Sequence, residues 1–154
     1  MDKLRVLFLC TGNSCRSQMA EAFLRHYAGD RFEPHSAGLE PKEIHPLTRQ
    51  VLAEQGIDMT GQYSKGVRVY LGKMLFPYLV TVCADAEAKC PTTFLGVSKR
   101  LHWAFDDPAA FDGTDAEKLQ MFREVRDQIG RQIQAFERRM GGDVTVRSKL
   151  GEGT

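Results

Sequence analysis

The sequence has almost no excess of charge of either sign, because its 21 lysine and arginine residues face 20 aspartate and glutamate residues. This balance gives no electrostatic reason to expect binding to nucleic acid or to an anionic membrane. No apolar run approaches the ~20 residues that span a bilayer, and the N-terminus lacks the features of a signal peptide. We therefore expect a cytoplasmic protein whose partners are small molecules or other proteins.

Cysteine is also scarce, with four residues in a chain of 154. So few cysteines do not make a secreted disulfide scaffold, and in a cytoplasmic protein they are more often catalytic or metal-binding. The sequence has no internal repeat and no sign of a second domain. At this length about 70% of the unfolded surface can be buried. We expect one monomeric domain over residues 1–140 and a flexible tail over residues 141–154.

Apolar runs that alternate with amphipathic segments predict an α/β fold. The run from Leu4 to Leu9 suits a central parallel strand covered on both faces. Pro34 removes a ladder donor from the second strand and so favours an edge position. The further elements expected are a helix over Gln18–Tyr27, a strand over Phe32–Ala37, a helix from Pro46 to Gly56, a strand over Tyr78–Val82, a helix over Ala84–Lys89 and a weak strand over Lys99–Trp103.

The C-terminal part predicts one long amphipathic helix. After Thr114 as a candidate cap, apolar residues recur at three- and four-residue steps from Leu119 to Met140, and we expect Gly141 and Gly142 to end the helix. The segment 66–77 has no clear periodicity and is expected to be helix or loop. The pattern as a whole predicts an open parallel sheet of about four strands, flanked by helices and joined by right-handed crossovers.

The chemistry of the sequence concentrates in the loop from Cys10 to Ser17, between the first strand and the first helix. Backbone amides in a glycine-containing loop that opens a helix converge on one point, where the helix dipole adds positive potential. The planar guanidinium of Arg16 can bind two oxygens of the anion. The positive potential at the loop also stabilises a nucleophilic thiolate at Cys10. The alternative is a buried cysteine beside an unrelated surface arginine. The residues expected to bind an oxyanion are Thr11, Gly12, Asn13, Ser14, Cys15, Arg16 and Ser17.

At these residues the chain resembles the low-molecular-weight protein tyrosine phosphatase superfamily, whose signature is a cysteine, five residues and then Arg-Ser. Within that superfamily it is most similar to the thioredoxin-coupled arsenate reductases, over about Arg5 to Phe136. The resemblance implies a phosphatase-like fold, arsenate as substrate, thioredoxin or an equivalent thiol reductant as partner, and no cofactor. The segments that carry it are Cys10–Glu21, Ser36–Gly38, Val80–Pro91 and Trp103–Pro108.

Two further cysteines, Cys83 and Cys90, lie beside a predicted strand end, where hydrolysis of a phosphate ester has no use for them. Strand ends in a doubly wound sheet face one crevice, so Cys83 can reach Cys10. We expect Cys10 to attack arsenic, Cys83 to attack Cys10, and Cys90 to attack Cys83. A helix over 84–90 holds the last two cysteines about 10 Å apart, beyond the ~7 Å limit for a disulfide, so it must unwind. Buried apolar packing and a structural zinc site are the alternatives.

Asp107 precedes Pro108 in a segment that resembles the general-acid loop of the superfamily, and the resemblance assigns it protonation of the leaving oxygen. A neighbouring oxyanion favours the protonated carboxyl that an acid needs. Asp106, or a simple turn aspartate, is the alternative. Ala109 stands where the tyrosine phosphatases usually have an aromatic residue, which argues for a small inorganic anion over an aryl phosphate.

Some of the similar arsenate reductases bind potassium beside the oxyanion loop, and Asn13, Glu21 and Ser36 match three of the four ligand positions. The fourth position is Lys65, whose charge can replace the cation and pair with Glu21. A solvated surface lysine is the alternative. We expect no metal ion, a packing role for Cys15, and no catalytic role for the four histidines.

Two other functions stay open from the sequence alone. A low-molecular-weight phosphatase with redox-regulatory cysteines would use the same loop for hydrolysis, and it would survive the loss of Cys83. An oxyanion-binding or redox-sensing module would bind arsenate without a covalent step.

Overall fold

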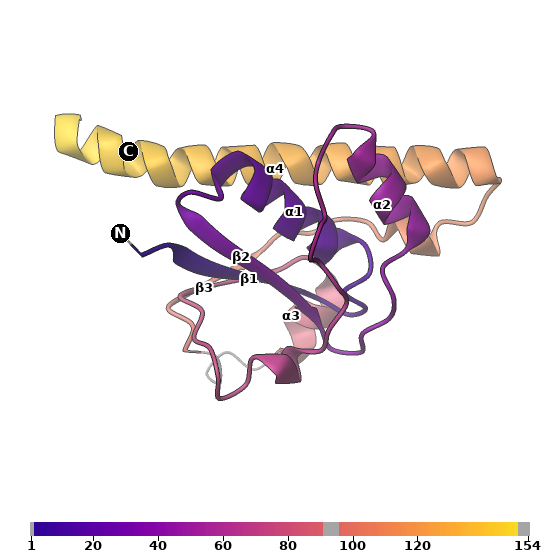
Figure 1. The fold of residues 1–154 in the computed structure, drawn as a ribbon, viewed down its shortest axis with the longest axis horizontal. Coiled ribbons are helices and arrows are strands. Elements are labelled where there is room, and N and C mark those ends of the chain that lie inside the picture. Colours follow the sequence, from indigo (N-terminus) through magenta and orange to yellow (C-terminus); the bar gives the residue numbers. More distant parts are fainter. Residues whose placement is uncertain (1, 91–95, 151–154) are drawn as a thin grey trace.

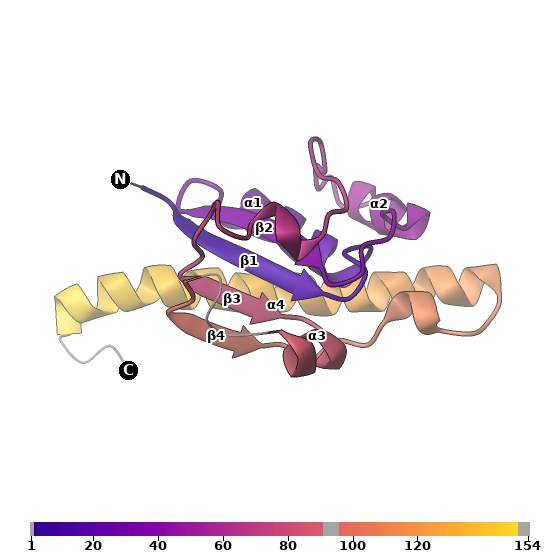
Figure 2. The same ribbon diagram turned by 90° about the horizontal axis from the view of Figure 1, so that it is seen from below.

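The computed structural model describes residues 2–90 and 96–150, with side chains described as far as residue 140, and shows a four-stranded parallel sheet flanked by helices (Figures 1 and 2). The predicted fold class is confirmed. The strands lie in the order β2-β1-β3-β4 and comprise β1 Leu4–Cys10, β2 Phe32–Gly38, β3 Tyr78–Thr81 and β4 Lys99–His102.

Strand β1 is central, as its apolar sequence predicts. Its residues Val6 to Leu9 are fully buried and pair with β2 on one side and β3 on the other. Pro34 lies in β2, at one edge of the sheet, where its missing amide disrupts no second ladder. The register sets Cys10 opposite Gly38, so both residues reach the carboxyl end of the sheet together.

Local capping signals mark the starts of two of the helices. Helix α2, Pro46–Ala53, starts with proline, whose fixed φ suits the first helical position. Helix α4, Asp115–Leu150, starts at a capping box in which Thr114 and Glu117 each bind the other's backbone amide, at 3.1 and 2.8 Å. Helix α1, Arg16–Ala28, lies alongside α4, and α3, Ala84–Lys89, follows β3 (Figure 2).

The predicted end of α4 is wrong, because the helix continues through Gly141 and Gly142 to Leu150. Each glycine lowers helix propensity by about 1 kcal/mol relative to alanine. Unlike proline, however, glycine keeps its amide and carbonyl in the hydrogen-bond ladder. The flexibility of the tail stays a prediction, and residues 151–154 lie outside the described residues.

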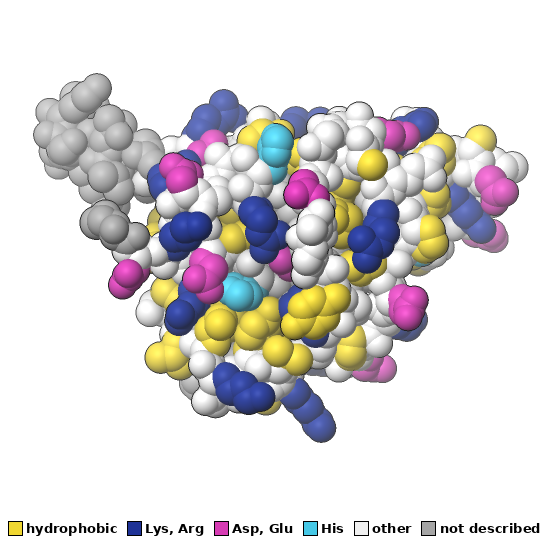
Figure 3. Space-filling model, viewed as in Figure 1, with side chains coloured by type: hydrophobic (Ala, Val, Ile, Leu, Met, Phe, Trp, Pro, Cys, Tyr) yellow, Lys and Arg dark blue, Asp and Glu magenta, His cyan; other side chains and the backbone are white. Residues whose placement is uncertain are grey.

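The connections and the surface complete the arrangement. Segment 66–77, expected to be helix or loop, is a loop with one 3₁₀ turn, Val67–Val69. Lysine and arginine side chains are interspersed with acidic ones on the face seen in Figure 3. Within the described ranges, no helix is long and apolar enough to cross a membrane.

Candidate active site

The loop between β1 and α1 curls around the Cys10 sulfur. Asn13 has a φ of 51°, in the left-handed region that asparagine tolerates better than most residues. This conformation brings the Asn13 amide to 3.2 Å from Cys10 Sγ. Gly12, the glycine of the loop, does not have a positive φ. The turn therefore depends on Asn13.

The Ser17 hydroxyl makes a second contact with Cys10, at 2.9 Å. Asn13 Nδ2 donates to the same hydroxyl oxygen at 2.9 Å, which leaves the Ser17 hydrogen free to point at the sulfur. The Asn13 amide and the Ser17 hydroxyl therefore both contact the sulfur. The side chains of Asn13 and Ser17 thus lie behind the loop and support Cys10.

Strand β2 supports the same loop through close backbone contact. A Cβ placed on Gly38 would lie 2.6 Å from Thr11 O and 2.9 Å from Asn13 N. Real Cβ atoms essentially never approach backbone atoms this closely. Only glycine at this position lets the end of β2 approach the loop, which explains the Ser-Ala-Gly sequence there.

Arg16 lies at the first position of α1 with its guanidinium partly engaged. Its Nη1 donates to Phe105 O at 3.1 Å, and its Nη2 lies 3.5 Å from Asp107 Oδ2. Its Nε is buried and has no hydrogen-bond partner among the described residues. Because a buried donor without a partner is costly, this atom is suited to bind an anion that enters the loop.

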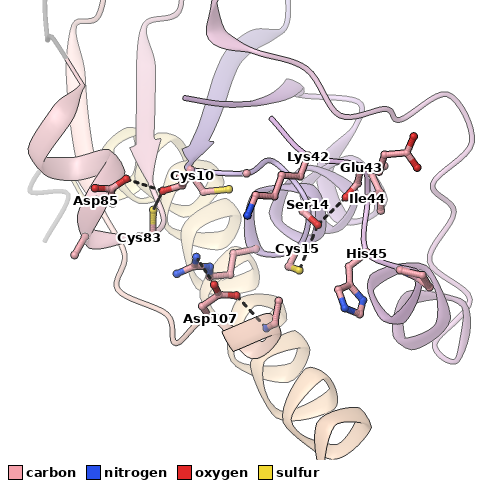
Figure 4. A pocket seen from close by; sticks show the side chains of 16 residues that line it. Cys10, Ser14, Cys15, Lys42, Glu43, Ile44, His45, Cys83, Asp85 and Asp107 are labelled. Atoms are coloured by element: carbon pink, nitrogen blue, oxygen red, sulfur yellow. Dashed lines mark hydrogen bonds and ion pairs between the residues drawn. The ribbon is translucent and has the colours of Figure 1, made fainter. Parts of the chain in front are cut away.

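A pocket of about 740 Å³ opens above the loop, and Figure 4 shows Cys10, Cys83 and Asp107 around one space. Most of the loop residues predicted to bind an oxyanion line this pocket. In the described part of the chain, no cluster of three or more histidine, cysteine or acidic side chains is arranged to hold a metal ion. The pocket is lined by Cys10, Thr11, Gly12, Ser14, Cys15, Arg16, Lys42, Glu43, Ile44, His45, Pro46, Cys83, Ala84, Asp85, Asp107 and Ala109.

Cys15 and Cys10 differ in their surroundings although both are buried in the loop. Burial raises the pKa of Cys15 to about 11, and hydrogen bonds with Thr48 and Ser14 offset this effect only in part. Cys15 is therefore a neutral thiol at physiological pH, in keeping with the packing role expected of it.

Cys83 and Cys90 lie at opposite ends of α3 and are both buried. Cys83 precedes the helix, and its Sγ accepts a hydrogen bond from Ala86 N at 3.4 Å. Cys90 follows the helix in an extended conformation, as expected for a residue before proline. Burial raises the pKa of Cys90, and the positive charge of Arg100 partly offsets this effect.

Thr11 links the oxyanion loop to α3, a contact that sequence reasoning missed. Its hydroxyl donates to Asp85 Oδ2 at 3.0 Å and contacts Cys83 Sγ at 3.5 Å. Asp85 also pairs with Lys89 one turn later, at 3.0 Å. The hydrogen bonds of Lys89 and Thr11 lower the pKa of Asp85, so its carboxylate is charged at neutral pH.

Asp107 lines the pocket opposite the loop, whereas its neighbour Asp106 does not. Its Oδ1 accepts a hydrogen bond from Ala109 N at 3.0 Å and so caps the 3₁₀ turn Pro108–Ala110. Its Oδ2 faces Arg16. The Asp-Pro sequence thus orients one carboxylate oxygen toward the space beside Cys10.

The predicted support residues form one buried network behind the loop. Asn13 Nδ2 donates to Ser36 Oγ at 2.9 Å, and Ser36 Oγ donates to Glu21 Oε1 at 2.6 Å. Lys65 Nζ lies 4.0 Å from the same carboxylate oxygen. Arg25, which sequence reasoning missed, binds Glu21 Oε2 at 2.7 Å. It lies one helical turn after Glu21, and that spacing was the available signal.

Lys65 is buried rather than solvated on the surface. Its backbone amide donates to Asn13 Oδ1 at 2.9 Å, and its Nζ donates to Tyr63 O at the same distance. The ammonium group also lies 4.4 Å from the centre of the Tyr63 ring. Burial lowers the pKa of Lys65, and the neighbouring Glu21 opposes this effect.

His45 was expected to be structural or exposed, and the structure places it at the pocket wall. Its Nδ1 accepts a hydrogen bond from Leu47 N at 3.1 Å and caps α2. Burial lowers the pKa of His45, and Asp107 opposes this effect. The position directly before Pro46 at a helix start was the signal for a cap.

A model of the family described as low molecular weight phosphotyrosine protein phosphatase matches residues 5–146. A curated arsenate reductase of Shouchella clausii is 46% identical over 136 residues, which are 88% of this chain and 96% of that protein. A structure titled an arsenate reductase in reduced state has a TM-score of 0.71 at 28% identity and covers 86% of this chain and 95% of that chain.

A second structure, of the Corynebacterium glutamicum thioredoxin-dependent arsenate reductase, is 30% identical with a TM-score of 0.57, over 86% of this chain and 63% of that chain. Both the family model and the curated relative extend over most of the chain. The chain therefore belongs to the low molecular weight phosphotyrosine protein phosphatase family and, within it, is similar to proteins named arsenate reductases.

Proposed function

We propose that this protein reduces arsenate to arsenite through a relay of three cysteines and so serves arsenic detoxification. The observation that carries the proposal is the common pocket of Cys10 and Cys83, next to Arg16 Nε, which is buried and has no hydrogen-bond partner among the described residues. An oxyanion site with one thiol suffices for phosphate ester hydrolysis. A second thiol in the same pocket allows a two-electron reduction.

The first step forms a covalent adduct. Arg16 and the loop amides hold arsenate, and the Cys10 thiolate attacks arsenic and displaces one oxygen. Asp107 gives a proton to that oxygen, which leaves as water. The Arg16–Asp107 contact opens as the anion takes its place on the guanidinium.

The second step transfers electrons. The Cys83 thiolate attacks Cys10 Sγ, and the electron pair of the sulfur–arsenic bond passes to arsenic, which leaves as arsenite. Cys90 then attacks Cys83 and releases the Cys10 thiolate. The two electrons gained by arsenic thus come from Cys83 and Cys90, which end as a disulfide.

An external dithiol, thioredoxin or an equivalent, then reduces the Cys83–Cys90 disulfide by exchange. The steps before this exchange use side chains and backbone amides of this chain. The cycle requires a compartment where thiols are kept reduced, as in the cytoplasm.

Lys65 supplies the structural cation behind the loop in this proposal. It lies 4.0 Å from Glu21, and its amide binds Asn13, the residue on which the loop turn depends. An ammonium group at this position repels a bound potassium ion. Turnover of the wild-type protein is then the same with potassium as with a larger inert cation.

A single-turnover experiment tests the function. Reduced protein, freed of reductant, is mixed with excess arsenate, and both arsenite and disulfides are measured by mass spectrometry. We expect one arsenite for each chain and a Cys83–Cys90 disulfide, because each chain supplies two electrons. The Cys83→Ser variant releases no arsenite but still hydrolyses p-nitrophenyl phosphate, which reports an intact loop. Hydrolysis without any arsenite from the wild-type protein would instead identify a phosphatase.

A further inference from the structure

Strand β4 holds the last turn of α3 through Arg100. The guanidinium Nη2 donates to Glu87 O at 2.7 Å, and Nη1 donates to Cys90 O at 2.9 Å. Carbonyls in the last turn of a helix have no donor within the helix, and positive charge there is favourable. Arg100 therefore satisfies the end of α3 from a neighbouring strand.

The Glu87 side chain is held from the same direction. Its Oε1 accepts hydrogen bonds from Thr81 Oγ1 at 2.7 Å and from Arg100 Nε at 3.3 Å. Because the Thr81 hydroxyl gives its hydrogen to Glu87, His102 Nδ1 donates to Thr81 Oγ1, at 2.8 Å. The hydrogen bond from Thr81, followed by Arg100, keeps the pKa of Glu87 below its ordinary value, so the carboxylate is charged.

We call Arg100, Glu87, Thr81 and His102 the α3 clamp. None of the four is among the described residues that line the active-site pocket. The pocket reaches only the start of α3, at Cys83 and the two residues after it. The clamp acts at the other end of the helix, on Cys90, and takes no part in binding the oxyanion.

The clamp contacts are incompatible with a disulfide between Cys83 and Cys90. Seven residues of helix separate the two Cα atoms by about 10 Å along the axis. A disulfide needs these atoms within ~7 Å of each other. Pairing must therefore unwind α3, and it moves Glu87 and Cys90 away from the guanidinium that holds both of their carbonyls.

We propose that the α3 clamp stabilises the dithiol form and thereby sets the reduction potential of the Cys83–Cys90 couple, with Arg100 as the main positioning residue. The inference rests on the proposed relay. In the oxidation, Cys83 and Cys90 lose two protons and two electrons and gain the sulfur–sulfur bond. In turnover the Cys10 thiolate leaves Cys83 as the Cys83–Cys90 bond forms. An external dithiol later returns the two electrons. Stabilising the reduced form raises the reduction potential of the couple and makes the disulfide more oxidising. The external dithiol therefore reduces it more completely.

The test measures the thiol–disulfide equilibrium. A chain carrying Cys10→Ser and Cys15→Ser retains only the two relay cysteines, and it is equilibrated with mixtures of reduced and oxidised dithiothreitol. Mass spectrometry after acid quenching gives the oxidised fraction. We expect Arg100→Gln to shift the equilibrium toward the disulfide by at least tenfold, which is about 30 mV for a two-electron couple. A shift below twofold overturns the proposal.

Further variants separate the clamp from general effects. Arg100→Lys keeps the charge but loses the fork, and we expect an intermediate shift. Arg5→Gln is the matched control, because Arg5 forms an exposed pair with Glu33 at 3.3 Å on β1 and β2, away from α3; it leaves the equilibrium unchanged. Glu87→Gln repeats the test with a variant of nearly the same shape, should Arg100→Gln fail to fold.

The outcomes distinguish the clamp from the relay. Unchanged equilibria in both the Arg100 and the Glu87 variants, with a normal disulfide in the parent chain, refute the clamp and leave the relay intact. No Cys83–Cys90 disulfide at any ratio of dithiothreitol forms refutes the relay, and the clamp with it.

Discussion

Replacing Gly38 by alanine tests the contact that shapes the oxyanion loop. The new Cβ would lie 2.6 Å from Thr11 O and 2.9 Å from Asn13 N. Both are backbone atoms, so no side-chain rotation can relieve the overlap. The φ of Gly38 is not positive, so alanine adds no conformational strain of its own. The loop must therefore move away from β2.

The size of the effect follows from this geometry. Overpacking of a tight site costs about 1–3 kcal/mol of stability. The displaced atom, Asn13 N, is the donor that lies 3.2 Å from Cys10 Sγ. A misplacement of about 1 Å in a catalytic group can cost about a hundredfold in rate. We expect Gly38→Ala to lower the rate of arsenite formation by about this factor.

Gly66→Ala is the matched control. Gly66 bridges Gly38 across the sheet edge, but its added Cβ would meet its nearest neighbours at 3.6 to 3.8 Å, which is ordinary contact. Urea denaturation gives the stability of both variants, and single-turnover arsenite formation gives the rate. If Gly38→Ala matched Gly66→Ala in both measurements, the reasoning about loop placement would be wrong.

Three further changes test individual charges, two of them at the site and one between the end of α2 and α4. Arg16→Lys keeps the charge but loses the fork, and we expect about a hundredfold slower arsenate-dependent loss of thiols; a rate within threefold of wild type would contradict this role. Lys65→Asp places a second carboxylate beside Glu21, so arsenite formation should become several-fold faster in potassium than in choline at equal ionic strength, while the wild-type rate stays the same in both salts. Glu54 binds Arg123 and Arg126, and these hydrogen bonds lower its pKa below the ordinary 4.5. Its stabilising effect is present above pH 4.5 and is lost as the pH falls through the lowered value, so Glu54→Gln should reduce stability to urea at pH 7, and its difference from the wild type should shrink as the pH falls below 4.5.

The site explains how one fold can serve either hydrolysis or reduction. In the proposed mechanism, the loop and Arg16 bind the anion and Asp107 transfers the proton, and these roles would be the same for either reaction. The difference lies in α3, which places Cys83 at the pocket and keeps Cys90 at its far end. The proposed clamp adds a reason why the spent disulfide is easily reduced, since the helix regains its contacts when the thiols are restored.

Features that depend on neighbouring residues could be predicted from the sequence. The central strand β1, the edge position of Pro34, the cap at Thr114 and the loop that ends in Arg16 follow from hydrophobic patterning and local backbone preferences. The prediction that α4 ends at Gly141 and Gly142 also came from local preferences. It was wrong because glycine weakens a helix without removing a hydrogen bond.

Contacts between residues far apart in the sequence became known from the three-dimensional structure. Gly38 touches the oxyanion loop through close backbone packing. The Cys90 carbonyl accepts a hydrogen bond from Arg100, which lies in β4, ten residues later in the sequence. Glu21 binds Ser36 and lies near Lys65, residues that three separate segments bring together. Such contacts depend on how the sheet and helices pack, and short-range propensity carries no information about them.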